Sequence, residues 1–131
     1  MAIFFIALMT SVSFLVKNTL NSVTEYNVSN SAKVAFEYFD LLYPGSYQIK
    51  NNVLYKGGTK LNDNFTSIDK LGEVLGYKVT IFQNDTRITT NVTKDGERAV
   101  GTKADEKVIK KVLEAGDSYT GTANVVGNDY M

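Results

Sequence analysis

The sequence predicts an α+β domain in which an antiparallel sheet is flanked by helices, and three observations indicate this fold class. A stretch without proline or glycine runs from Lys17 to Tyr43, and its apolar residues recur at helical spacing. After Pro44 the apolar residues alternate with polar ones, which is typical of β-strands. Two further strands joined by a short turn then lie between two short helical segments, an order that favours an antiparallel sheet covered by helices.

The first sixteen residues differ from the rest of the chain. Met1–Val16 carries no charge, and its polar members are only Thr10, Ser11 and Ser13. Because a membrane-spanning helix needs about 20 apolar residues, this run predicts the outer part of a transmembrane helix whose cytoplasmic start is missing. An uncleaved signal-like segment and a buried core helix are the alternatives. Lys17 would mark the exit into the polar headgroups, where a lysine side chain can snorkel.

The second predicted element is one long helix over residues 17–43, continuing out of the membrane as a stalk. It ends at Pro44-Gly45, because proline lacks the backbone N–H that a helix interior needs. Its apolar stripe is interrupted by the polar segment Tyr26–Ser31, which suits a weak and shiftable helix–helix contact. We therefore expect a parallel homodimer through this helix.

The remaining residues carry the predicted sheet and its covering helices. Asn51-Asn52 between alternating residues is typical of a hairpin turn, Thr66 can cap a helix and Gly76 can end one. No strand follows that would close the edge of so small a sheet, so a C-terminal closing strand is expected to be missing. The predicted elements are a hairpin around Asn51-Asn52, a helix over Thr66–Leu75, strands over Tyr77–Phe82 and Thr86–Val92, a helix over Asp105–Ala115 and a strand from Ser118 to Met131.

Composition excludes several classes of function. The formal net charge is zero, so the basic face that nucleic-acid binding requires is not indicated. The chain has no cysteine and no histidine, which excludes disulfides, thiolate metal sites, a histidine base and a cysteine nucleophile. The adjacent carboxylates of Asp105 and Glu106 open a predicted helix, where acidic residues favour the positive end of the dipole. We therefore expect neither an enzyme nor a bound cofactor or metal.

The candidate ligand-binding residues lie on the strand predicted over residues 86–92. Arg87, Thr89 and Asn91 are two residues apart and would project from one face, because strand side chains alternate. Arg87 offers a planar fork for a carboxylate, and threonine and asparagine add hydrogen bonds. The alternative is that Arg87 is a solvated surface charge, paired with Asp85 or Glu97.

Two further cations are candidates for the same site. Arg98 and Lys103 lie in the connection to the following helix, near Gly101, where the backbone can approach a ligand closely. Together with Arg87 they predict a small anionic ligand.

Several stretches resemble a known family, in the family's order and spacing. They are Gly45–Ile49, Leu54–Gly57, Val79–Phe82 with Asp85–Asn91, Gly96–Thr102 and Val112–Gly121. From about Phe36 to Met131 the sequence resembles the single Cache domains of bacterial methyl-accepting chemotaxis proteins and histidine kinases.

The resemblance implies an extracytoplasmic sensor between two membrane helices that binds small molecules, often organic acids or amino acids. In related citrate and dicarboxylate sensors, an arginine on the strand that corresponds to Arg87 binds carboxylate. A histidine often follows that arginine three residues later, but the position is Thr90 here, so the resemblance does not extend to dicarboxylate specificity. The expected organisation is a partial transmembrane helix (1–16), an extracytoplasmic stalk helix (17–43) and a PAS-like Cache sensor domain (44–131) without its closing strand, held at the cell membrane. The alternative function is a structural or protein-interaction module without a small-molecule ligand.

Overall fold

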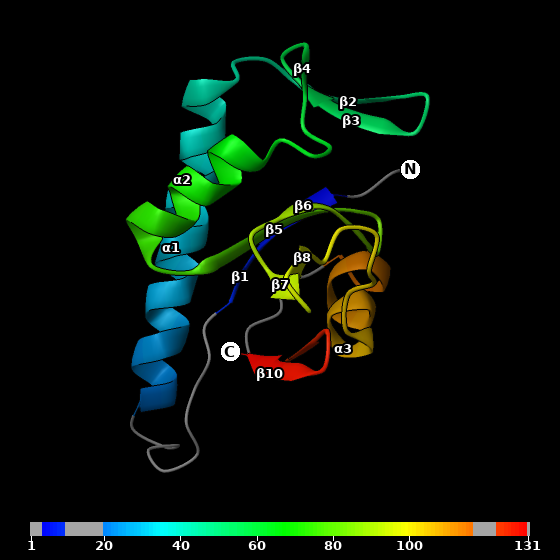
Figure 1. Ribbon diagram of the computed structural model, residues 1–131. Helices are drawn as coiled ribbons and strands as arrows, with labels where there is room; N and C mark the ends of the chain where they lie inside the picture. Colours follow the sequence, from blue (N-terminus) through cyan, green and yellow to red (C-terminus); the bar gives the residue numbers. More distant parts are fainter. Residues whose placement is uncertain (1–3, 10–19, 117–122, 131) are drawn as a thin grey trace.

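Figure 1 shows the computed structural model, which describes residues 4–9, 20–116 and 123–130. Helices and antiparallel strands alternate along the chain, which confirms the predicted α+β fold class. The elements are β1 (Phe4–Met9), α1 (Leu20–Leu42), β2 (Tyr47–Lys50), β3 (Val53–Lys56), β4 (Thr59–Lys60), α2 (Phe65–Leu75), β5 (Lys78–Gln83), β6 (Thr86–Thr90), β7 (Thr93–Lys94), β8 (Glu97–Arg98), α3 (Glu106–Val108), the π-helix η2 (Ile109–Glu114), β9 (Ala123–Val125) and β10 (Asn128–Tyr130).

The strands form small antiparallel sheets. The central sheet has the order β1-β5-β6, a second has the order β2-β3-β4, and β7-β8 and β9-β10 are hairpins. The predicted hairpin is confirmed, because β2 pairs with β3 around Asn51 and Asn52. Both asparagines have positive φ values, 50° and 61°, a conformation that asparagine tolerates in tight hairpin turns.

Phe4–Met9 forms a strand, so the prediction of a helix is wrong for these six residues. The strand pairs with β5, from Phe4 opposite Gln83 to Met9 opposite Lys78. A short apolar run fits a strand and a helix equally well by pattern, and pairing here provides hydrogen-bond partners at the edge of β5. In the described ranges no helix combines the length and the apolar character that a membrane crossing needs. Residues 1–3 and 10–16 of the predicted transmembrane segment lie outside the described residues.

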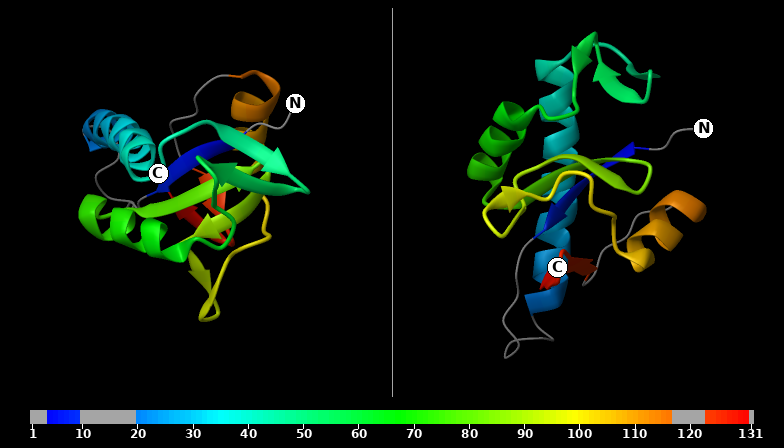
Figure 2. Two further views of the ribbon diagram at one scale, coloured as in Figure 1. Left: turned by 90° about the horizontal axis from the view of Figure 1, so that it is seen from above. Right: turned by 45° about the vertical axis from the view of Figure 1, so that its right-hand side comes forward.

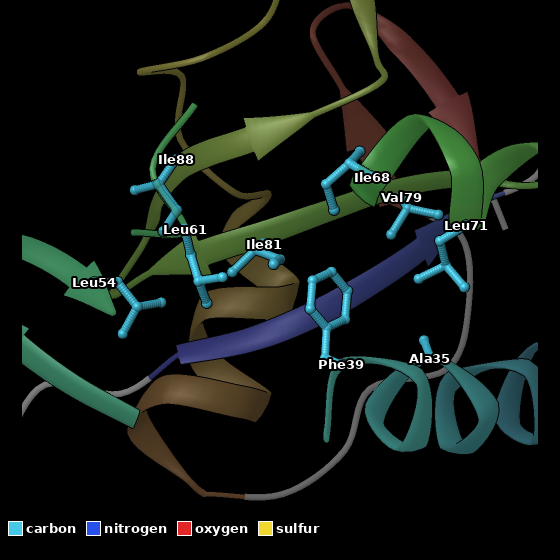
Figure 3. Packing of buried hydrophobic residues seen from close by; sticks show 9 residues of the cluster. All are labelled: Ala35, Phe39, Leu54, Leu61, Ile68, Leu71, Val79, Ile81 and Ile88. Atoms are coloured by element: carbon cyan, nitrogen blue, oxygen red, sulfur yellow. The ribbon is translucent and has the colours of Figure 1, made fainter. Parts of the chain in front are cut away.

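One hydrophobic core joins α1, α2 and the central sheet (Figure 3). Ala35 and Phe39 are four residues apart, so they lie on the same side of α1, and they enter the core together. The C-terminal half of α1 therefore shares its core with the residues after Pro44. The buried members are Ala35, Phe39, Leu54, Leu61, Ile68, Leu71, Val79, Ile81 and Ile88.

The end of α2 follows the prediction, but its start does not. Asn64 precedes the helix, whose first residue is Phe65, so the predicted cap Thr66 lies inside the first turn. Gly76 ends the helix as predicted, with φ of 72° and its N–H donated to the Gly72 carbonyl. This left-handed conformation favours glycine, which is why the stop signal could be read locally.

The helix predicted over Asp105–Ala115 is present, but only its first residues are α-helical. The Asp105 side chain caps it by accepting a hydrogen bond of 2.8 Å from the Lys107 N–H. Residues 109–114 then continue as a π-helix. Its predicted inner residues, among them Val112 and Leu113, are half-buried.

Candidate functional site

A β-bulge decides which side chains of β6 share a face. Arg87 lies opposite Phe82 and Thr89 opposite Ile81, and the register shifts between these two pairs. Cross-strand neighbours share a face, whereas Ile81 and Phe82 are consecutive and point to opposite faces. Arg87 and Thr89 therefore lie on opposite faces, and the prediction that they project together is wrong. Side chains two residues apart share a face only in a regular strand. A bulge inserts one additional residue and therefore breaks this alternation.

The two faces of β5 and β6 differ in what covers them. α2 and the strands β2–β4 lie on one side of these strands, and α3 and the β9-β10 hairpin lie on the other (Figures 1 and 2). The first side contains the hydrophobic core with Ile81. On the second side lies what we call the polar face of the sheet, which consists of Thr80, Phe82, Arg87 and Thr90, all of them buried.

Arg87 is the largest fully buried side chain among the described residues, with only 1% of its surface exposed. Its Nη1 atom donates to Thr102 Oγ1 at 2.7 Å and to the Lys103 carbonyl at 2.8 Å. The guanidinium also lies over the Phe82 ring, 4.9 Å from its centroid, in a cation–π contact. These contacts fix the plane of the guanidinium and occupy one of its nitrogens.

The other edge of the Arg87 guanidinium has no partner among the described residues. Its Nε atom is buried without a hydrogen bond, and the hydrogen bonds of the guanidinium to described residues are both made by Nη1, none by Nη2. Arg87 also takes part in none of the ion pairs of the described residues. Burial lowers the pKa of Arg87 from its ordinary value, because moving an unpaired charge out of water is unfavourable. The alternative of a solvated surface charge is therefore wrong.

A covering segment, residues 99–104, lies along the free edge of β6. Its backbone pairs with that of Arg87, where the Gly101 N–H donates to the Arg87 carbonyl at 2.8 Å and the Arg87 N–H to the Thr102 carbonyl at 2.9 Å. The Ala104 N–H donates to the Asp85 carbonyl at 2.8 Å. The segment thus encloses the arginine and supplies both acceptors of Nη1.

The other two predicted cations have protein carboxylates as partners. Lys103 Nζ lies 2.7 Å from Asp85 Oδ1, and both Nη atoms of Arg98 reach the Asp69 carboxylate at 2.7 Å. Arg98 also lies over the Phe65 ring of α2. The hydrogen bond from Arg98 lowers the pKa of Asp69, and that from Lys103 lowers the pKa of Asp85. The structure therefore does not bring these cations together with Arg87 as one cluster of unpaired charge.

Asn91 and Thr89 face the side of α2. The Asn91 amide accepts from the Val79 N–H at 2.6 Å and donates to the Tyr77 carbonyl at 3.3 Å, so both of its ends are used within the protein. Gly72 of α2 approaches it so closely that a Cβ atom there would lie 2.2 Å from Asn91 Nδ2. Thr89 is fully buried, and its hydroxyl has no partner among the described residues.

Sequence reasoning missed two residues that hold the arginine. Thr102 lies in a connection without periodicity, so no pattern indicated that its hydroxyl would reach Nη1. Phe82 was assigned to a strand, but its place opposite Arg87 depends on the bulge. No group of three or more acidic side chains in the described part of the chain is arranged to hold a metal ion.

Part of the chain matches the model of a known protein family. Residues 59–131 match the family model described as single cache domain 3, which is just over half of the chain and includes Arg87 and the covering segment. The part of the resemblance upstream of residue 59 lies outside this match. The searches of curated proteins and of solved structures each found no match.

Proposed function

Because the chain belongs to the single Cache domain 3 family, we propose that it is the extracytoplasmic sensing domain of a bacterial transmembrane receptor, of the chemotaxis or sensor-kinase type, and that it binds a small anionic molecule at Arg87. Cache domains are sensor domains that bind small molecules in signalling receptors. On this proposal the chain has no catalytic activity of its own. The observation that carries the site is the buried Arg87 guanidinium, which has an open edge and no carboxylate partner among the described residues.

The proposal explains why the chain buries an arginine that has no carboxylate partner among the described residues. A buried charge without a counter-ion costs several kcal/mol, and an anion at the free edge of the guanidinium removes that cost. A charge-assisted hydrogen bond contributes about 1.5–3 kcal/mol. Since Arg87 is almost fully enclosed, entry of the ligand requires a segment that covers this side of the sheet, such as residues 99–104, to move. Ligand binding would then be coupled to a change in the chain on this side of the sheet.

We expect a ligand found in a thermal-shift screen of organic acids and amino acids to lose most of its affinity when Arg87 is replaced by lysine. Lysine keeps the charge but loses the planar fork, so binding is expected to weaken about tenfold or more, and further with alanine. Calorimetric titration of the wild-type and variant chains measures the change. The matched control is Lys94→Ala, because Lys94 is an exposed cation on β7.

Equal affinities of the wild type and Arg87→Ala would show that the ligand binds elsewhere. A chain that responds to no compound of the screen would favour the alternative of a structural or protein-interaction module. Folding of each variant is checked by circular dichroism, so that a lost response is not mistaken for a lost fold.

The proposed receptor also needs a membrane location and a partner copy. Val34 and Leu41 of α1 are 49% and 83% exposed and seven residues apart, so they lie on nearly the same side of the helix. We propose that α1 pairs in parallel with α1 of a second copy, outside the membrane.

A cysteine introduced at Val34 tests both the location of α1 outside the membrane and its pairing with a second copy, because the chain has no cysteine of its own. In intact cells Val34→Cys is expected to react with a membrane-impermeant thiol reagent and, on mild oxidation, to form a disulfide-linked dimer. Lys94→Cys is the control, expected to be labelled without crosslinking, since Lys94 lies on β7 and not on α1. Labelling that requires opened cells would contradict the location, and a solely monomeric Val34→Cys would contradict the pairing.

A further inference from the structure

We infer that the anion recognised at Arg87 is a monocarboxylate, a small acid with one carboxylate group and no ammonium group beside it. This inference rests on the proposed function and narrows its ligand from organic acids and amino acids to one chemical class. Three features of the polar face support it, each stated for the described residues. The Nε and Nη2 atoms of Arg87 have no hydrogen-bond partner, Arg87 is the only buried cation on this face, and no carboxylate is free to pair with an ammonium group.

The edge of the Arg87 guanidinium that has no hydrogen-bond partner among the described residues has the geometry of a carboxylate site. Nη1 is already bonded to Thr102 Oγ1 and to the Lys103 carbonyl, which leaves Nε and Nη2 without acceptors among the described residues. These two nitrogens present parallel N–H groups in one plane, which match the two oxygens of a single carboxylate. The Phe82 ring beneath the guanidinium holds that plane in place.

Arg87 is the only buried cation on this face among the described residues. Arg98 and Lys103 are paired with Asp69 and Asp85, and neither of the two is buried. The other buried cation of the described residues, Lys56, binds Asp40 at the end of α1. A second carboxylate on the ligand would therefore enter a buried region without a cation to neutralise it, which is unfavourable.

Among the described side chains, this face has no carboxylate free to pair with an ammonium group. None of the aspartates and glutamates whose side chains the structure describes is buried. Asp85 is bound to Lys103, and Asp105 accepts the backbone N–H groups of Lys107 and Asn124. The Thr80 and Thr90 hydroxyls, which face the same side as Arg87, are hydrogen-bonded to each other at 2.7 Å. An amino acid would thus bury its ammonium without a counter-charge.

The test is a matched series of ligands titrated calorimetrically into the wild-type chain. Each monocarboxylate of two to six carbons is compared with the same molecule carrying a 2-ammonium group, with its dicarboxylate and with its uncharged amide. Propionate, L-alanine, succinate and propionamide form one such set, and inorganic phosphate is added as a non-carboxylate anion. We expect the best monocarboxylate to bind about tenfold or more tightly than its amino, dicarboxylate and amide counterparts and than phosphate.

The outcomes separate this inference from the proposed function. Tighter binding of an amino acid, a dicarboxylate or phosphate to the wild type would overturn the monocarboxylate class. Loss of that binding in Arg87→Lys would still support a sensor that uses Arg87. Equal binding of a monocarboxylate and its amide would overturn the carboxylate contact itself. If no compound binds, both proposals fall. Because the comparison is made on the wild type, it does not depend on whether any Arg87 variant folds.

Discussion

Replacing Phe39 by alanine is expected to destabilise the protein by about 3–5 kcal/mol, because it removes a large side chain from the middle of the core. Phe39 is only 1% exposed, and its ring lies edge-on to Tyr38 with the ring centroids 5.7 Å apart. The cavity would open between α1 and the central sheet, where Ile68 and Leu71 of α2 also pack. Urea denaturation of the chain measures the change in the free energy of unfolding.

The matched control for this change is Phe36→Ala. Phe36 lies on the same helix, three residues earlier, but is 38% exposed and belongs to neither buried cluster. We expect its replacement to cost less than about 1 kcal/mol, as is usual for surface positions. A loss of stability as small for Phe39→Ala as for Phe36→Ala would show that α1 is not an integral part of the domain and serves only as a connecting stalk.

Replacing Gly57 by alanine is expected to destabilise the protein by about 3 kcal/mol, the sum of an overpacking term and a left-handed backbone term. Gly57 has φ of 55°, and a Cβ atom there would lie 1.8 Å from the Pro44 carbonyl oxygen. The clash is with backbone, so it cannot be relieved by a rotamer change. The hairpin would have to move away from the end of α1, to which Lys56 is tied through Asp40 and the Gly45 carbonyl.

Gly58→Ala separates the two terms. Gly58 also has positive φ, 85°, but nothing lies within 4 Å of a Cβ atom placed there. Its replacement is expected to cost only the backbone term of about 1 kcal/mol, measured by the same denaturation experiment. Equal destabilisation by the two alanines would show that the close approach to Pro44 contributes nothing.

Local signals account for the parts of the fold that the sequence predicted. The Asn51-Asn52 turn, the stop at Gly76 and the start of the helix at Asp105 each depend on residues that are close together in the chain. Residue type and spacing are sufficient there, because positive φ and side-chain capping are properties of a few adjacent residues. Where the local signal was ambiguous the prediction was wrong, as for Phe4–Met9, whose apolar run fits a strand and a helix equally.

The candidate site was predicted only in part. Arg87 was chosen because its guanidinium fits a carboxylate, and this chemistry is a property of the residue alone. Its ligand-binding role stays a prediction, as do those of Thr89, Asn91, Arg98 and Lys103. The prediction that Arg87 and Thr89 share one face of the strand is wrong, because the bulge in β6 turns Thr89 to the other face of the sheet.

The sequence by itself therefore determined the α+β fold class and the order of most elements, and it named Arg87 among the candidate ligand-binding residues. Only the tertiary structure decided that Arg87 is buried, that its Nε and Nη2 atoms have no hydrogen-bond partner among the described residues, and that Asp85 and Asp69 pair with Lys103 and Arg98. These features depend on segments brought together from distant parts of the chain, since Thr102 encloses Arg87 and Asp69 reaches Arg98 from another element. Burial and ion pairing are set by such long-range contacts, whereas periodicity reports only the geometry of neighbouring residues.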